Sequence, residues 1–172
     1  ELFFVLLLAI IYRKYLKEKW IDFKNNFTSY FELGFKSWFL GLIGMIFLNN
    51  YISKIASPIV ENENAVQTII NNFPTIALIL TTLLAPIVEE LIFRKSLQDI
   101  KLPKWIFIIV SGLIFGYVHL IGSENPLDYL YILPYGLLGS CFAYTLSKTD
   151  NIYVTIMMHM LHNGVLTIRT NS

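Results

Sequence analysis

Long apolar stretches alternate with short polar segments along the chain, and this pattern predicts helices that cross a membrane. Several of the apolar stretches approach the ~20 residues that a membrane-spanning helix requires. We therefore predict an all-α fold, a polytopic transmembrane helical bundle that forms a single membrane-embedded domain over residues 1–172. The expected spans cover about residues 2–12, 37–55, 73–99, 103–121, 129–146 and 152–168.

The segment at residues 13–35 follows a different pattern, which predicts an amphipathic helix lying in the membrane interface. Its large apolar side chains recur at intervals of three and four, with lysines between them, so one face suits lipid and the other the headgroups. A cytosolic amphipathic connector is the alternative interpretation. The recurring residues are Leu16, Trp20, Phe23, Phe27 and Phe31.

Composition narrows the class of protein. The chain is 55% hydrophobic and only 15% charged, which leaves too little polar surface for a water-soluble domain of this size. A net charge of +1 without a dense basic patch argues against a nucleic-acid partner. The single cysteine, Cys141, provides no disulfide framework. Residues 2–12 lack a basic leader and a small-residue cleavage site, so we expect the remnant of a span rather than a signal peptide.

Lysine and arginine residues gather in alternate loops, and this asymmetry predicts the orientation of the bundle. Residues 13–36 hold six of them, residues 94–104 hold four, and Lys148 makes the eleventh of 13. The positive-inside rule places these three segments in the cytoplasm. The segments expected on the outer side are the polar loops at 61–64 and 122–128, Lys54 and Arg169.

Ionisable residues inside membrane spans are costly and usually functional. All three histidines of this chain lie in apolar segments, as do two adjacent glutamates. These residues and their polar neighbours are the candidates for chemistry. They are Glu89, Glu90 and Arg94 in the third predicted span, His119 in the fourth, and His159, His162 and Asn163 in the last.

Helical spacing gives the two adjacent glutamates different environments. Glu90 and Arg94 are four residues apart, lie on one helical face and can form an ion pair. Glu89 is rotated by about 100° from Glu90, so it can face another environment. We therefore expect Arg94 to neutralise Glu90, which leaves Glu89 available for proton chemistry as a general base.

The same spacing pairs the histidines with neighbours on their own helices. His159 and Asn163 are four residues apart, so they share a face and could offer two donors to a developing oxyanion. Phe115 lies one turn from His119 and can restrict the rotation of its imidazole. His162 lies outside these pairs, and we expect it to be structural or to support another site residue.

Proline and glycine residues are expected to shape the bundle around these groups. Pro86 removes a backbone hydrogen bond to Thr82 and is expected to kink the third span just before the glutamates. Gly112 and Gly116 form a small-xxx-small pair that lets the fourth span approach a neighbouring helix closely. The glycines of residues 136–140 are expected to serve close helix contact as well.

Three short motifs in order give the chain a resemblance to a known family. EELIFR (89–94) reads as EExxxR, FGYVH (115–119) as FxxxH, and HMLHN (159–163) as HxxxN. On successive hydrophobic segments, these motifs resemble those of the membrane-embedded CAAX protease and bacteriocin-processing family, also called CPBP or Abi, which includes type II CAAX prenyl endopeptidases. The resemblance covers about residues 70–168, without a departure at the motif positions.

The resemblance implies a role for each matching residue in an intramembrane glutamate-type endopeptidase. Glu89 would activate the attacking water, assisted by His119. His159 and Asn163 would stabilise the oxyanion, and the ion pair described above would hold the helix and the site together. No cofactor is expected. The implied substrate is a membrane-associated protein or peptide, CAAX-like or a peptide precursor, reached through a cavity open to the cytoplasm of a bacterial plasma membrane.

Two alternatives use the same residues. A zinc-dependent intramembrane peptidase could take ligands from Glu89, His119 and His159, although no HExxH spacing is present. A non-enzymatic membrane protein, either a proton-coupled transporter or a bacteriocin-immunity scaffold, could use the intramembrane Glu and His groups without catalysis. The short chain without an inverted repeat argues against transport.

Overall fold

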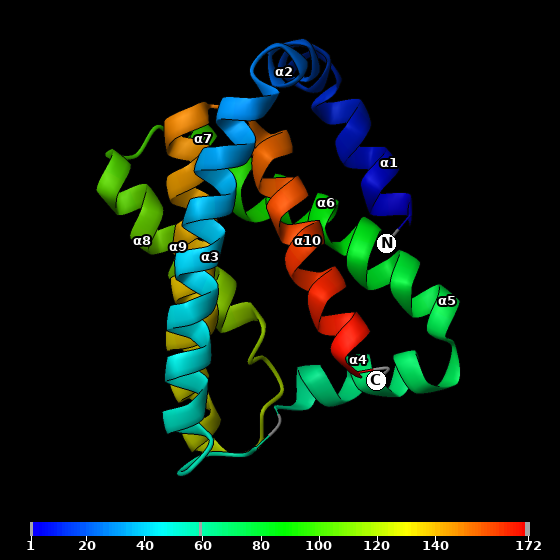
Figure 1. Ribbon diagram of the computed structural model, residues 1–172, viewed down its shortest axis with the longest axis vertical. Helices are drawn as coiled ribbons and strands as arrows, with labels where there is room; N and C mark the ends of the chain where they lie inside the picture. Colours follow the sequence, from blue (N-terminus) through cyan, green and yellow to red (C-terminus); the bar gives the residue numbers. More distant parts are fainter. Residues whose placement is uncertain (1, 59, 171–172) are drawn as a thin grey trace.

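The computed structural model describes residues 2–58 and 60–170, and all regular structure within them is helical (Figure 1). Side chains at 61, 62 and 168–170 are outside this description, so the predicted outward placement of Arg169 lies outside the described residues. The main helices are α1 (Leu2–Ile11), α2 (Arg13–Asn25), α3 (Phe27–Ile52), α4 (Glu61–Asn72), α8 (Lys104–Val118), α9 (Ile132–Thr149) and α10 (Ile152–Thr170).

A continuous helical run over Pro74–Asp99 changes its hydrogen-bonding register along its length. Within it lie three short α-helical parts joined by two π-helical turns, in which backbone bonds reach five residues back instead of four. A 3₁₀ turn, Pro126–Tyr131, leads similarly into α9. The parts of the run are α5 (Pro74–Ala77), the π-helical Leu78–Leu84, α6 (Ala85–Glu90), the π-helical Leu91–Lys95 and α7 (Ser96–Asp99).

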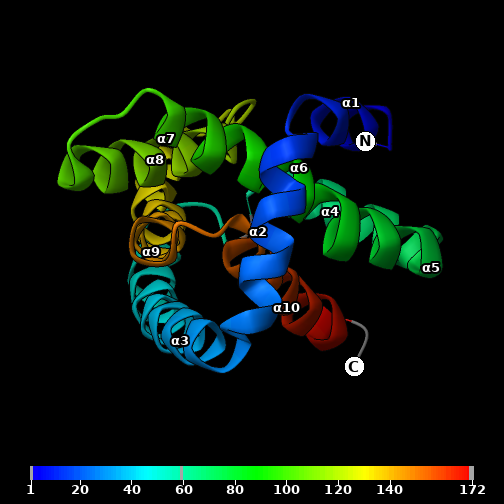
Figure 2. The same ribbon diagram turned by 90° about the horizontal axis from the view of Figure 1, so that it is seen from above.

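Three of these helical runs are long and apolar enough to cross a membrane: Phe27–Ile52, Pro74–Asp99 and Pro126–Thr149. This confirms the predicted all-helical membrane fold. Two predicted spans are shorter than a full crossing, because α1 has 10 residues and α8 has 15. Seen from above, α9 lies between α3 and α8, and α2 passes over α10 (Figure 2).

The predicted interfacial helix is shorter than its sequence pattern indicated. It ends at Asn25, and residues 27–35 belong to the spanning helix α3. The side chain of Asn26 explains the break, since its Nδ2 donates to the carbonyl of Asp22 (3.1 Å) and to the Asp22 carboxylate (2.8 Å). Such local side-chain bonds compete with the helix. The boundary of 13–35 was therefore wrong at its C-terminal end.

A second difference concerns the outward segment at residues 61–64, which was expected to be a loop. These residues instead begin α4. The helix has an apolar side, on which Ile70 is only 3% exposed, whereas Thr68 on another side is exposed. Packing of this apolar side stabilises α4, although the polar residues of its first turn gave no indication of a helix.

Glycines set the spacing between α8 and α9, as predicted. A Cβ at Gly112 would lie 2.5 Å from the carbonyl oxygen of Gly136, and a Cβ at Gly116 would lie 2.7 Å from the carbonyl oxygen of Ile132. Backbone therefore meets backbone at this crossing, which glycine alone permits. Close contact here holds the end of α8 against α9, where Tyr135 stacks on His119.

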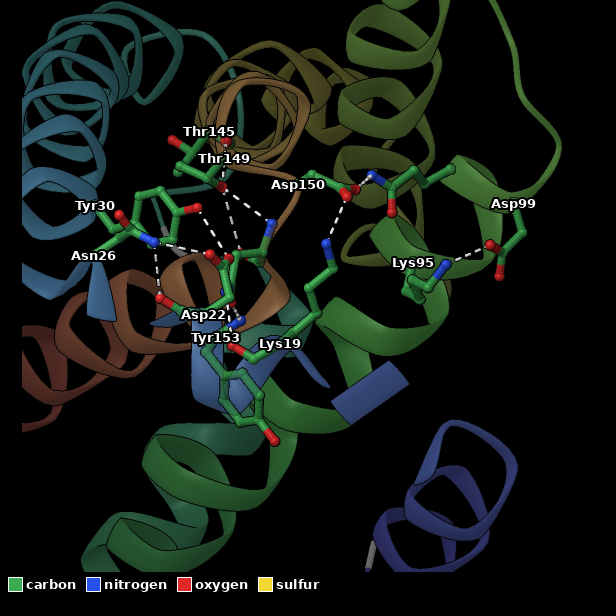
Figure 3. A network of polar contacts seen from close by, with 12 residues as sticks. Lys19, Asp22, Asn26, Tyr30, Lys95, Asp99, Thr145, Thr149, Asp150 and Tyr153 are labelled. Carbon is green, nitrogen blue, oxygen red and sulfur yellow. Dashed lines mark hydrogen bonds and ion pairs between the residues drawn. The ribbon is translucent and has the colours of Figure 1, made fainter. Parts of the chain in front are cut away.

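A polar network ties α2 to the helices that carry the candidate residues (Figure 3). Asn151, at the α9–α10 junction, is fully buried and donates to the carbonyl of Lys19 (2.8 Å) and the carboxylate of Asp22 (2.9 Å). The neighbouring Asp150 accepts from the ammonium of Lys19 (2.6 Å) and from the side-chain amide of Gln98 (2.8 Å). The network thus joins α2 to the start of α10 and to the end of the run Pro74–Asp99.

Candidate active site

Phe115 is the common contact of the candidate residues from three different helices. Its ring centroid lies 4.4 Å from that of His119, one turn along its own chain segment, and 5.6 Å from that of His159 on α10. The guanidinium carbon of Arg94 lies 4.1 Å from the same ring. The close α8–α9 crossing therefore gathers groups that are distant in sequence around one aromatic side chain.

The buried part of the site is the ion pair between Glu90 and Arg94. The guanidinium Nη1 lies 3.3 Å from the carboxylate Oε1, and both side chains are fully buried. The Arg94 Nη2 also donates to the carbonyl of Gly139 (3.4 Å), and the rings of Phe115 and Phe142 (5.5 Å) flank the guanidinium. A carboxylate, a carbonyl and two aromatic faces thus replace water around this charge.

Glu90 has a second partner that helical spacing did not predict. The Nδ1 of His159 lies 2.8 Å from the Glu90 Oε1 atom. Because an ionised carboxylate only accepts, we assign the imidazole proton to Nδ1. Phe142 stacks on the imidazole at 5.1 Å. Glu90 therefore orients His159 so that its other nitrogen, Nε2, faces Glu89, with the Glu89 Oε2 atom 3.7 Å away.

The accessible part of the site centres on Glu89. Its side chain is 25% exposed, compared with 0% for Glu90 and 3% for His159. Its Oε2 atom is itself buried and has no hydrogen-bond partner among the described residues. Glu89 is thus the carboxylate that both reaches the accessible side and keeps an acceptor unused.

His119, the residue that follows α8, is the second imidazole of the site. Its Nδ1 is 2.8 Å from the carbonyl oxygen of Phe115. Since a carbonyl oxygen only accepts, Nδ1 carries the proton and Nε2 is left as an acceptor. Tyr135 stacks on the other side of the imidazole, with centroids 5.1 Å apart. Two aromatic rings therefore fix the orientation of a second potential proton acceptor.

Asn163 takes part in a contact that helical spacing did not predict. Its side-chain Nδ2 donates to the backbone carbonyl of Thr81 (2.8 Å), in the π-helical turn Leu78–Leu84. His159, in turn, is bound to Glu90. The two residues lie one turn apart on α10, but each is held by the helical run Pro74–Asp99 and not by the other.

Sequence reasoning missed two of the aromatic residues that shape the site. Phe142 and Tyr135, both on α9, stack on His159 and His119. They lie outside the three motifs, and helical spacing within one segment cannot relate them to histidines on other helices. His162 is buried and accepts from the indole N–H of Trp38 (3.4 Å). This contact is consistent with the structural role expected for His162.

The geometry of these residues does not fit a zinc ion. Within residues 2–58 and 60–170, no three His, Cys, Asp or Glu side chains converge as metal ligands do. A three-ligand zinc site from Glu89, His119 and His159 is therefore not assembled here, and no chemical step through a metal is derived.

Comparison with known proteins relates this site to a family of peptidases. A family model described as "Type II CAAX prenyl endopeptidase Rce1-like" matches residues 71–165. A protein of Bacillus subtilis (strain 168) named "Putative membrane peptidase YdiL" is 32% identical over 111 residues, which cover 63% of this chain. The matched part is 42% of that relative, so the chain spans about two fifths of its length. No solved structure matches the chain.

Proposed function

This chain belongs to the Rce1-like family of type II CAAX prenyl endopeptidases, and we propose that it is an intramembrane peptidase in which Glu89 activates the attacking water. One observation carries the proposal. Glu89 is partly exposed and keeps a carboxylate oxygen without a hydrogen-bond partner among the described residues, beside a fully buried ion pair. That arrangement suits a general base, which needs a water within reach and no competing partner.

The proposed reaction begins with a water bound between Glu89 and the Nε2 atom of His119. The Glu89 carboxylate takes a proton from this water, and the resulting hydroxide forms a bond to the carbonyl carbon of the substrate peptide. The carbonyl π-electrons move onto oxygen and give a tetrahedral oxyanion. The carbon–nitrogen bond then breaks, and the proton held by Glu89 passes to the leaving amine. All atoms and charges balance without a cofactor.

His159 and Asn163 are the proposed partners of the oxyanion. For His159 to donate through Nε2, the imidazole must carry a second proton. Asn163 has two amide N–H groups, of which one is used by Thr81 and the other is left for a substrate oxygen.

The proposed substrate is a membrane-associated protein or peptide, cleaved near the cytoplasmic side. The charge distribution supports this orientation, since the lysine-rich α2 covers one end of the bundle (Figure 1). A prenylated CAAX-type C-terminus and an unmodified peptide precursor are both compatible with the site. The cell would be a bacterium, as for the relative from Bacillus subtilis.

The experiment that tests this proposal compares membrane proteomes of cells with the wild-type chain and with Glu89→Ala. We expect an uncleaved precursor to accumulate in the variant, because loss of a general base lowers the rate by about a hundredfold or more. Glu124→Ala, which removes an exposed carboxylate from a loop, serves as the control. Equal precursor levels in the wild type and Glu89→Ala would rule out the proposed role of Glu89.

A further inference from the structure

The hydrogen bond between Asn163 and Thr81 exists because a backbone acceptor is left over in the π-helical turn. The N–H of Ala85 donates to the carbonyl of Leu80, five residues back. In that register the carbonyl of Thr81 would accept from residue 86. Residue 86 is Pro86, which has no N–H. The α-helical donor for Thr81, Ala85, is engaged by Leu80.

Side chains near this carbonyl leave Asn163 as its donor. The hydroxyl of Thr81 itself donates one turn back, to the carbonyl of Ala77 (2.8 Å). Helix α10 packs against the same turn, where a Cβ at Gly164 would lie 3.4 Å from the side chain of Thr82. The amide of Asn163 enters from this side and supplies the missing N–H. In a membrane, an unpaired carbonyl is costly, so the contact is favoured.

This contact also settles which way the Asn163 amide points. Its oxygen cannot face the carbonyl oxygen of Thr81, since both only accept. The nitrogen therefore faces Thr81, and the second N–H on that nitrogen is held in a defined direction. An amide without this contact could rotate about its terminal torsion, which is broad and roughly two-fold.

We infer that Pro86 is a positioning residue: by withholding a backbone N–H, it keeps the Thr81 carbonyl open for Asn163 and so fixes the amide that we assign to the oxyanion. The inference rests on the proposed function for its catalytic consequence, but the positioning itself is independent of it. Pro86 acts here through Asn163, not through a bend of the helix. Restoring an N–H at position 86 should release the Asn163 amide and leave the rest of the helix intact.

The positioning is tested without substrate, by hydrogen exchange of side-chain amides. The full chain, labelled with ¹⁵N-asparagine, is studied in lipid nanodiscs, and the Asn163 signal is assigned by its loss in Asn163→Ala. We expect exchange at Asn163 to be at least about tenfold slower than at the exposed Asn25, and Pro86→Ala to remove most of this protection. The control is Pro74→Ala, at the first position of the same helical run, where a missing N–H has no helical partner.

The catalytic consequence is tested by a double-mutant cycle, with an internally quenched farnesylated CAAX peptide as the probe. Pro86→Ala should lower kcat by about tenfold, and by no more than Asn163→Ala does, with KM unchanged. In the Asn163→Ala background, Pro86→Ala should have no further effect. Pro86→Ser, which also restores the N–H, should match Pro86→Ala in both tests.

The outcomes separate this inference from the proposed function. Unchanged amide protection in Pro86→Ala overturns the positioning role, as does a Pro86→Ala chain that fails to fold, because a restored N–H should cost no stability. Additive losses in the cycle would show that Pro86 acts on another group, such as Glu89. Wild-type cleavage by Glu89→Ala would instead sink the proposed function, while the exchange result would stand on its own.

Discussion

Glu90 forms an ion pair with Arg94 and also accepts a hydrogen bond from His159, which gives it more than the neutralised role expected from helical spacing. Arg94 lies one turn along the same helix, and His159 approaches from α10. The carboxylate therefore fixes the position of Arg94 and the tautomer of His159 together. Glu89, one residue earlier, is left to face the accessible side. In the proposed mechanism, Glu90 orients the neighbouring groups and Glu89 transfers the proton.

The ion pair predicts a large effect of removing one partner. Arg94→Ala should lower the free energy of unfolding by about 3–5 kcal/mol, because it leaves Glu90 as an uncompensated buried charge. Thermal and denaturant unfolding in detergent micelles would measure this loss. Lys36→Ala, which removes an exposed cation from α3, is the control. A loss as small as that of the control would contradict a desolvated pair.

At the scale of single residues, the sequence predicted what lies within one helix and missed what lies between helices. The spacing of Glu90 with Arg94, and of Phe115 with His119, follows from 3.6 residues per turn. The contact of His159 with Glu90 depends on how α10 packs against α6. No spacing within one segment encodes that distance, so the second partner of Glu90 could not be predicted.

At the scale of elements, the crossing of α8 and α9 positions His119. Gly112→Ala would place a Cβ 2.5 Å from the backbone oxygen of Gly136, which cannot rotate away as a side chain can. We expect a loss of about 1–3 kcal/mol in unfolding free energy, as for other overpacked sites. Gly164→Ala, whose Cβ would meet its nearest neighbour at 3.4 Å, should lose far less. Equal effects in thermal unfolding would refute the close crossing.

Asp22 joins α2 to Asn151 at the α9–α10 junction, which predicts that the stability of the fold depends on pH. The side-chain amide of Asn151 donates to the carboxylate and holds the pKa of Asp22 below its usual value, with Tyr30 and Asn26 adding further bonds. The folded state thus binds this proton less readily than the unfolded state does. The resulting stability is present above the unfolded pKa near 3.8 and is lost as pH falls through the folded pKa.

Asp22→Asn is the variant that isolates this contribution. Its thermal stability should fall less steeply than that of the wild type when pH is lowered from about 6 to about 3. Glu18→Gln, at an exposed carboxylate on the same helix, is the matched control and should keep the wild-type slope. If Asp22→Asn retains the wild-type pH dependence, the network does not couple α2 to the bundle as described.

The ends of a helix could be predicted only where the pattern of apolar and polar side chains changes at the same residue as the backbone conformation. Phe23, Phe27, Phe31 and Phe35 form one series of ring contacts that runs across the break at Asn26, edge-to-face between Phe23 and Phe27 and stacked beyond it. The spacing of apolar side chains therefore continued past Asn26, where α2 ends. The π-helical turns were equally invisible, because a shift to bonds five residues back changes no residue type. Pro86 predicted a lost backbone hydrogen bond in the third span, but the sequence did not indicate that the carbonyl left without a backbone donor would be that of Thr81.

For the whole molecule, the distribution of charge predicts which ends of the helices face the cytoplasm. In a Cys141→Ala background, single cysteines at Lys101 and Glu124 place one thiol at each end of α8. A membrane-impermeant maleimide should label Glu124→Cys in intact cells and Lys101→Cys only after permeabilisation. The reverse pattern would invert the bundle and place the accessible side of the site away from the proposed cytoplasmic substrate.

Family membership and the general architecture could both be predicted from the sequence, whereas the position of each site residue along its helix bundle could not. Three motifs in order and a hydrophobic pattern sufficed for the former. The position of a site residue depends on where short elements begin and end, such as α8, whose 15 residues end just before His119. In the structure, His119 lies between the rings of Phe115 and Tyr135.

The most direct test of the central claim measures kcat of Glu89→Gln on the precursor that accumulates in the Glu89→Ala cells, with purified protein in lipid vesicles. We predict a fall of at least about a hundredfold, because glutamine cannot take a proton from water. The thermal stability should stay close to that of the wild type, since the Glu89 Oε2 atom has no hydrogen-bond partner among the described residues. A folded Glu89→Gln chain with wild-type kcat would contradict the account.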